Sequence, residues 1–299
     1  MINCIKTLIL LSLFLISSHV FAIPADMKLL SDIPYGKDAD QTLDVYIPAD
    51  VKDAPVIFMV HGGAWRNWGD KADKIEVENK IDHWVTQGFI FISTNFRALP
   101  KVGPVIQAKD VEAAILFSQQ KVREWGGAPE KFILMGHSSG AHVVSLISSN
   151  YSRLKGNGIT PVLGTISMDS SAYNIVGRMT PPNSSDFYKE VFGTDPDYWE
   201  KASPFYALTD KIPPFLAICS IQSLTACVEA KKFLKKANGL GAHAELLAVD
   251  LTHGEINSEL GKRTCYTSDV DDFLKKLSPD IASMLTNQST RTQKNCAGD

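Results

Sequence analysis

A serine in a turn framed by glycines is the clearest chemical feature of the sequence. Residues Gly136–Gly140 read Gly-His-Ser-Ser-Gly; they follow the strand-like run Lys131–Met135 and open a run of small residues typical of a helix start. Alone, the pattern also fits an ordinary Gly/Ser turn. Between a strand and a helix it predicts a nucleophile elbow, whose strained turn lifts the hydroxyl of Ser138 clear of the sheet. The amide of Ser139, at the helix N-terminus, is then placed to donate to an oxyanion.

A pair of glycines follows a second apolar run, Val56–Val60, because residues 61–65 read His-Gly-Gly-Ala-Trp. Glycine lets a backbone amide approach a ligand closely. We therefore expect the amides of Gly62 and Gly63 to join that of Ser139 in an oxyanion hole. The alternative is a tight turn after a strand, but the two motifs occur in the chain order that this chemistry requires.

A histidine on a loop after the last strand-like run supplies the base. Thr252-His253-Gly254 follows Ala244–Val249, where the histidine of a serine–acid–histidine series belongs. We predict that His253 removes the proton of Ser138 and later returns it to the leaving group. His142 is nearer to the serine in sequence, but it lies one turn along the elbow helix, and we expect it to pack beneath the nucleophile.

Aromatic side chains near these motifs are candidates for contact with a substrate. We expect Trp65 and Trp68 to border the mouth of the pocket, and Trp65 and His137 to contact the substrate, although His61 and His137 also fit purely structural positions flanking the site. A segment at about 173–208 is rich in Pro, Asn, Ser and aromatic residues. Its aromatic side chains could line the pocket or form a small core of their own.

The arrangement of apolar runs predicts an α/β fold with a mostly parallel sheet and helices on both faces, since strand-like and helix-like segments alternate. We expect one domain over residues 23–299, with residues 173–208 inserted over the carboxyl ends of the strands and a polar, frayed tail over about 280–299. The expected strands are Leu43–Ile47, Val56–Val60, Phe89–Ser93, Lys131–Met135, Val162–Met168, Phe215–Cys219 and Ala244–Val249, and the expected helices are Val105–Trp125, Val228–Ala237 and Val270–Leu277.

These motifs together resemble a known family. The loop His61–Gly63, the elbow Gly136–Gly140, the pair His253-Gly254 and the N-terminal segments Tyr35-Gly36 and Leu43–Tyr46 are similar to the carboxylesterase and arylformamidase-like (feruloyl-esterase-like) branch of the α/β hydrolases. The resemblance covers about residues 33–277. It implies the α/β-hydrolase fold and hydrolysis of carboxylic esters or of small amides such as formamides, with no metal or organic cofactor.

The catalytic acid departs from the pattern of that family, in which an Asp follows the strand that here is Phe215–Cys219. Residues 220–226 read Ser-Ile-Gln-Ser-Leu-Thr-Ala and contain no carboxylate. We expect Asp169 instead, because it ends the preceding strand at the same edge of the sheet and preserves the order serine, acid, histidine. Asp250 and Glu255, close to the histidine in sequence, remain alternatives.

Composition and the N-terminal segment indicate where the protein works. The chain has 299 residues, of which 44% are apolar, and a formal net charge of −3, so nothing in the charge favours a nucleic acid or an anionic membrane as partner. Residues 1–22 read as a signal peptide, with Lys6, an apolar run at Leu8–Ile16 and small residues at a cleavage site. No later run is long enough to span a bilayer. We expect a periplasmic or secreted protein without an integral membrane segment after cleavage.

Cysteines fit an oxidising compartment. Cleavage would leave four of them, and we expect the pair Cys219–Cys227, close in sequence, with Cys265–Cys296 tying down the tail; free buried thiols are the alternative. The prediction for the whole chain is an exported serine esterase with a small-molecule substrate. A small-amide hydrolase and a non-catalytic binding protein, which the missing loop acid would explain, are the alternatives. The sequence carries no signal for an oligomeric state.

Overall fold

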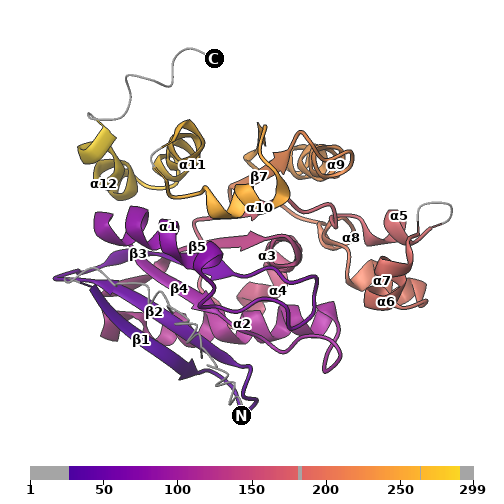
Figure 1. Cartoon of the computed structure of the whole chain (residues 1–299), viewed down its shortest axis with the longest axis horizontal. Coiled ribbons are helices and arrows are strands. Elements are labelled where there is room, and N and C mark those ends of the chain that lie inside the picture. Colours follow the sequence, from indigo (N-terminus) through magenta and orange to yellow (C-terminus); the bar gives the residue numbers. More distant parts are fainter. Residues whose placement is uncertain (1–26, 181–183, 263, 290–299) are drawn as a thin grey trace, which may run out of the picture.

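A twisted sheet runs through the middle of the molecule (Figure 1). The computed structural model describes residues 27–180, 184–262 and 264–289. Eight strands follow the order β1-β2-β4-β3-β5-β6-β7-β8. Antiparallel pairing joins β1 to β2 and β2 to β4, and all other neighbours are parallel. The strands are Met27–Pro34 (β1), Thr42–Pro48 (β2), Ala54–Val60 (β3), Ile90–Thr94 (β4), Gly127–His137 (β5), Gly164–Met168 (β6), Phe215–Ser220 (β7) and Ala244–Val249 (β8).

Alternate residues of the central strands feed two separate cores, because successive side chains of a strand point to opposite faces. Phe58 and Val60 of β3 pack in the core on one face, whereas Ile57 and Met59 pack in the core on the other. Every residue of β3 is buried. This burial on both faces explains why the strand reads as an unbroken apolar run, and it confirms the predicted α/β architecture.

Helices cover both faces of the sheet. The core that contains Phe58 is closed by α2 and α3, and α9 packs its Phe233 against Phe215 on that same side. The core that contains Ile57 is closed by α1, α11 and α12. The helices are Lys74–Trp84 (α1), Pro104–Lys121 (α2), Ser139–Ser149 (α3), Tyr151–Gly156 (α4), Ile175–Met179 (α5), Asp186–Phe192 (α6), Pro196–Lys201 (α7), Pro204–Ala207 (α8), Ala226–Gly239 (α9), His253–Ser258 (α10), Cys265–Lys275 (α11) and Pro279–Ser289 (α12).

Several elements differ from the sequence prediction. The sequence analysis missed β1, whose side chains are mostly half-buried or exposed, and the amphipathic helix α1. The frayed tail expected from about residue 280 is wrong for its first part, because α12 buries Ile281 and Leu285 against the core. Residues 290–299 and the predicted signal peptide at 1–22 lie outside the described residues.

The segment between β6 and β7 is a group of four short helices, α5 to α8 (Figure 1). Its buried side chains, among them Ile175, Met179 and Phe192, form a small core with Trp65 from the loop after β3. The segment therefore packs against the carboxyl ends of the strands, as expected for an insertion beside the site. Within the described part of the chain, no helix is both long and apolar enough to cross a membrane.

The expected bond between Cys219 and Cys227 is present, with Cα atoms 5.1 Å apart. It joins the end of β7 to the first turn of α9 and closes the loop between them. The second expected pair, Cys265–Cys296, is not described, since Cys296 lies outside the described residues.

The turn from β5 into α3 depends on close backbone packing. Ser138 adopts φ 56° and ψ −117°, a conformation that L-residues rarely take. A Cβ atom at Gly136 would lie 2.5 Å from the carbonyl oxygen of Gly140. A Cβ atom at Gly140 would overlap the carbonyl oxygens of Val60 and His61, at the end of β3. The two glycines thus allow β3, β5 and α3 to meet directly beneath the serine.

We expect Gly140→Ala to lower the free energy of unfolding by about 3 kcal/mol or more, because the backbone of β3 cannot move aside without disturbing the sheet. Gly239→Ala, at the end of α9, is the matched control, since a Cβ atom there meets nothing within 4 Å. That variant should be neutral or stabilising by up to about 1 kcal/mol. Urea unfolding of both variants checks this; equal stabilities would contradict the close packing at the elbow.

Candidate active site

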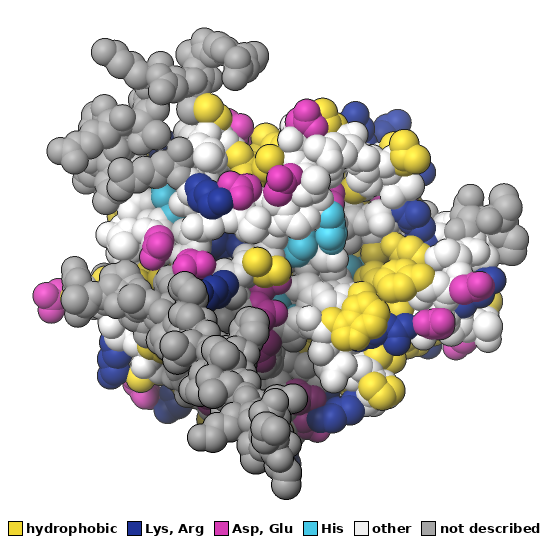
Figure 2. Space-filling view, viewed as in Figure 1, with side chains coloured by type: hydrophobic (Ala, Val, Ile, Leu, Met, Phe, Trp, Pro, Cys, Tyr) yellow, Lys and Arg dark blue, Asp and Glu magenta, His cyan; other side chains and the backbone are white. Residues whose placement is uncertain are grey.

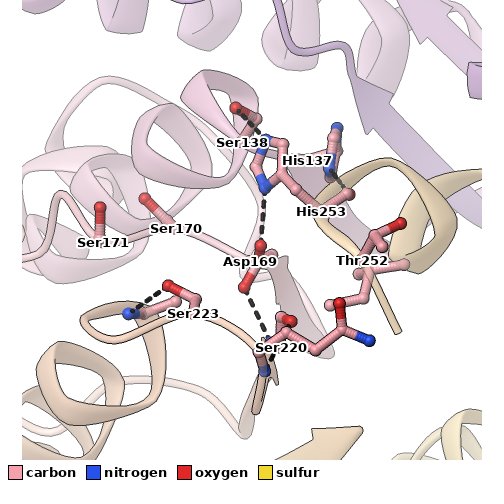
Figure 3. Close-up of polar contacts among 12 residues, drawn as sticks. His137, Ser138, Asp169, Ser170, Ser171, Ser220, Ser223, Thr252 and His253 are labelled. Carbon is pink, nitrogen blue, oxygen red and sulfur yellow. Dashed lines mark hydrogen bonds and ion pairs between the residues drawn. The ribbon is translucent and has the colours of Figure 1, made fainter. Parts of the chain in front are cut away.

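Three side chains from separate elements form one chain of hydrogen bonds (Figure 3). Nε2 of His253, at the start of α10, lies 2.9 Å from Oγ of Ser138, and its Nδ1 lies 2.6 Å from Oδ2 of Asp169. An ionised carboxylate only accepts hydrogen bonds. Nδ1 therefore donates to Asp169, and Nε2 is left to accept the hydroxyl proton of Ser138.

Asp169 is held in a buried and strained position. It follows β6 with φ 51°, and its amide donates to the carbonyl of Ile218 at 2.8 Å. Its Oδ1 accepts a hydrogen bond from the amide of Ser220 at 2.9 Å. Burial opposes its ionisation, but the hydrogen bonds from His253 and Ser220 prevail and hold the pKa of Asp169 below its usual value.

The other two candidate acids point elsewhere. Oδ1 of Asp250 accepts from Nε2 of Gln222 at 3.0 Å. Oε2 of Glu255 accepts from the amide of Thr252 at 2.8 Å, in a capping box at the start of α10. The structure therefore brings Asp169 to His253, while Asp250 and Glu255 serve local contacts.

The end of β7, after which the family pattern places the acid, supports Asp169 through Ser220. Ser220 donates its amide N–H to Asp169. Its hydroxyl donates to the carbonyl of Leu251 at 2.6 Å, two residues before His253. Cys219 and Cys227 close the loop after β7. The role of Ser220 was missed by the sequence analysis, because a backbone amide leaves no mark in the sequence.

The glycine loop differs from expectation at one position. The amide of Gly62, expected to face the oxyanion, instead donates to Oε1 of the buried Glu76 at 3.3 Å. The carbonyl of Gly62 accepts from Nδ1 of His61 at 2.6 Å. In a trans peptide the N–H points opposite to the C=O, so the amide of Gly63 is turned away from the His61 ring. Ser139 begins α3, where a first-turn amide has no partner within the helix.

Gly62 nevertheless lies against the nucleophile. A Cβ atom at this position would stand 3.3 Å from Cβ of Ser138 and 3.3 Å from Nδ1 of His137. Gly62 thus provides room beside the serine, while its amide is engaged with the carboxylate behind the loop. Among the described residues, no group of three or more His, Cys, Asp or Glu side chains is arranged to hold a metal ion.

Comparison of the sequence with known protein families identifies the family to which the chain belongs. The family model described as BD-FAE matches residues 43–222, which include the glycine loop, the elbow and Asp169. The chain belongs to the BD-FAE family.

Individual relatives of this BD-FAE protein carry esterase and formamidase names. It is 26% identical to Esterase LipQ of Mycobacterium tuberculosis, over 63% of this chain and 47% of the relative. Isoprenylcysteine alpha-carbonyl methylesterase ICME of Arabidopsis thaliana is 26% identical over 76% of this chain and 56% of the relative. Kynurenine formamidase of Salmo salar is 25% identical over 54% of each chain. The chain thus spans about half the length of these curated relatives.

Solved structures share the fold. A truncated carbohydrate esterase from gut microbiota superposes with a TM-score of 0.70 at 21% identity, covering 84% of this chain and 96% of that one. Esterase B from Lactobacillus rhamnosis gives a TM-score of 0.69 at 19% identity and covers 91% of each chain. At these identities the likeness shows the α/β-hydrolase fold of this BD-FAE member.

His137 contacts the main chain and the ring of His253. Its Nε2 donates to the carbonyl of His253 at 2.9 Å, and the two rings lie 4.6 Å apart between centroids. Burial, with a smaller contribution from the neighbouring His253, lowers the pKa of His137 to about 3, so the ring is neutral. The sequence predicts either a substrate contact or a structural residue at His137, and in the structure its ring supports the main chain at His253.

The two tryptophans of the glycine loop do not line the rim as a pair. Trp65 is only 5% exposed and donates its indole N–H to Nδ1 of His142 at 3.0 Å, whereas Trp68 is 68% exposed. Trp65 is instead the centre of an aromatic cluster with Phe187, Tyr188 and Phe192 from α6. Figure 2 shows hydrophobic side chains gathered beside the histidines on this face.

His142 is a fully buried connector between the elbow helix and the insertion. Its Nδ1 accepts from Trp65, and its Nε2 donates to the carbonyl of Ala202 at 2.8 Å. Burial lowers the pKa of His142 to about 4. Protonation would add a hydrogen to Nδ1, where it would face the indole N–H of Trp65. The ring of His142 must therefore be neutral for this hydrogen bond to form.

We expect His142 to make the protein sensitive to acid. The unfolded chain binds a proton at His142 near pH 6.5, whereas the folded chain resists protonation until about pH 4. Stability is therefore lost as the pH falls from 6.5 towards 4, by about 2 kcal/mol at pH 5 for this residue. The loss of unfolding free energy between pH 7 and pH 5 should shrink by that amount in His142→Gln.

Urea unfolding at the two pH values gives the measurement. The exposed His243 supplies the control, because His243→Gln should leave the pH dependence of stability as it is in the wild type. Equal pH dependence in His142→Gln and the wild type would contradict a neutral, buried His142.

Proposed function

We propose that this protein is a serine esterase in which Ser138 is the nucleophile, His253 the base and Asp169 the orienting acid. The single observation that carries the proposal is the continuous hydrogen-bond chain from Oγ of Ser138 through His253 to Asp169, at 2.9 and 2.6 Å. An acid–base–nucleophile series of this geometry activates a hydroxyl that is otherwise a weak nucleophile.

The reaction follows from these positions. Oγ of Ser138 attacks the ester carbonyl carbon while Nε2 of His253 takes its proton, and the carbonyl oxygen becomes an oxyanion. The amides of Gly63 and Ser139 hold that oxyanion. His253, held by Asp169, then protonates the leaving alcohol, and an acyl group remains on Ser138. Water, deprotonated by His253, attacks this acyl-enzyme; the bond between the acyl carbon and Oγ of Ser138 then breaks, His253 returns the proton to Oγ, and the carboxylic acid is released.

The substrate we propose is a small-molecule carboxylic ester. The relatives named as an esterase and a methylesterase support an ester. The relative named kynurenine formamidase supports a small-amide hydrolase as the second candidate. The missing loop carboxylate is the argument for a third possibility, a binding protein on a hydrolase scaffold; the 2.6 Å contact between Asp169 and His253 supports the esterase over it.

We further propose that the protein is exported to the periplasm or the cell exterior. The signal-like residues 1–22 support export. The disulfide between Cys219 and Cys227 supports an oxidising compartment, since such bonds are rare in a reducing cytosol.

Incubation of the purified protein with a fluorophosphonate should label Ser138. The protein should also hydrolyse a short aryl ester faster than a formanilide. Ser138→Ala should lose the label and both activities, because it removes the hydroxyl that lies 2.9 Å from Nε2 of His253. Mass spectrometry and initial rates give the measurements. Faster turnover of the formanilide would favour the amidase, and a folded wild type with neither label nor turnover would contradict an esterase.

Replacement of Asp169 tests the acid. We expect Asp169→Asn to lower kcat by on the order of 10⁴-fold, because an amide can donate a hydrogen bond to Nδ1 and so stabilise the wrong tautomer of His253. Asp250→Asn is the matched control and should retain turnover, as its carboxylate bonds to Gln222. Near-native kcat in a folded Asp169→Asn would show that another group orients the base.

A further inference from the structure

Two charged side chains are buried one turn apart on α1, behind the catalytic residues. Glu76 is 3% exposed and Lys80 is 1% exposed. Burying charge is costly unless the group is hydrogen-bonded or paired. The hydrogen bonds of the two side chains lead to different parts of the site: Glu76 bonds to Gly62 and Lys80 bonds to Asn257.

Glu76 reaches the oxyanion loop. Its Oε1 accepts the amide of Gly62 at 3.3 Å. Glu76 lies in the first turn of α1, where the partial positive charge of the helix terminus favours a carboxylate. With the His61 ring bonded to the carbonyl of Gly62, the peptide groups on both sides of Gly62 are fixed. This fixes the direction of the Gly63 amide, which is the donor that we assign to the oxyanion.

Lys80 reaches the helix that carries the base. Its Nζ donates to the main-chain oxygen and to Oδ1 of Asn257, both at 2.8 Å, and to the carbonyl of Ile75 at 3.0 Å. Asn257 is fully buried in α10, one turn beyond His253. Burial lowers the pKa of Lys80 to about 8, against the effect of Glu76, so the ammonium keeps all three donor hydrogens at neutral pH.

We propose that Glu76 and Lys80 are positioning residues that set the oxyanion loop and the base-bearing helix α10 relative to one another. Four residues of α-helix span about 6 Å and deform little, so α1 acts as a rigid spacer between the oxyanion loop and α10. Misplacement by about 1 Å of groups that must act together can cost on the order of 10²-fold in rate. This proposal rests on the proposed esterase function and assigns a role to two residues that touch no substrate.

Kinetics on the aryl ester test the proposal with the intact chain. We expect Lys80→Met, which keeps an apolar stem, and Glu76→Leu to lower kcat by about 10- to 100-fold while KM stays within about threefold. Glu76→Gln should recover most of the loss, because its amide oxygen can still accept from Gly62. Lys74→Met, an exposed lysine on the same helix, is the matched control and should match the wild type.

A second readout separates positioning from general weakening of the fold. Affinity for a boronic acid that mimics the tetrahedral intermediate should fall in parallel with kcat in Lys80→Met and Glu76→Leu, at a temperature where circular dichroism shows both folded. Should Lys80→Met not fold, the comparison of Glu76→Leu with Glu76→Gln decides the question, since rescue by the amide depends on the bond to Gly62.

Two failures are distinguishable. If the wild type turns over the ester but folded Lys80→Met and Glu76→Leu keep kcat within twofold, or lose only in KM, the positioning proposal is overturned and the proposed function stands. If the wild type shows neither fluorophosphonate labelling nor turnover, the proposed function itself has failed, and this inference fails with it.

Discussion

The site depends on keeping a negative charge on Asp169 at a buried place. A carboxylate away from water is unstable unless hydrogen bonds replace its hydration. Here the ring of His253 and the amide of Ser220 supply them, and the resulting low pKa keeps the group ionised. An ionised Asp169 holds the proton of the imidazole on Nδ1. Only with that proton in place can Nε2 accept from Ser138.

The structure divides this work among elements that the chain order keeps far apart. Asp169 follows the end of β6, but it is fixed by the amide of Ser220 at the end of β7, and the Cys219–Cys227 bond closes the loop after that strand. The glycine loop after β3 is fixed from behind by α1. Asp169 and the glycine loop are thus each held by a neighbouring element, because the parallel strands bring their carboxyl ends to one edge of the sheet.

The insertion α5–α8 is connected to the elbow helix α3 through Trp65 and His142. Trp65 contacts His142 of α3 and the aromatic side chains of α6, and His142 contacts the carbonyl of Ala202. A neutral His142 is required for these bonds, so burial and hydrogen bonding reinforce one another. The aromatic cluster beside the serine is accordingly part of a packed core, with Phe187 left 40% exposed at its edge.

Local patterns in the sequence determined the α/β alternation, the elbow around Ser138 and the position of His253 after β8, because apolar periodicity and glycine spacing express backbone requirements directly. They also limited the candidates for the catalytic acid to Asp169, Asp250 and Glu255. Only the tertiary structure shows that Asp169 is the one of the three that lies beside His253, since this depends on the distance between β6 and α10. The orientation of the Gly62 amide and the bonds of Lys80 were equally beyond the sequence. They depend on which buried polar groups folding brings together, and that is set by packing between elements distant along the chain.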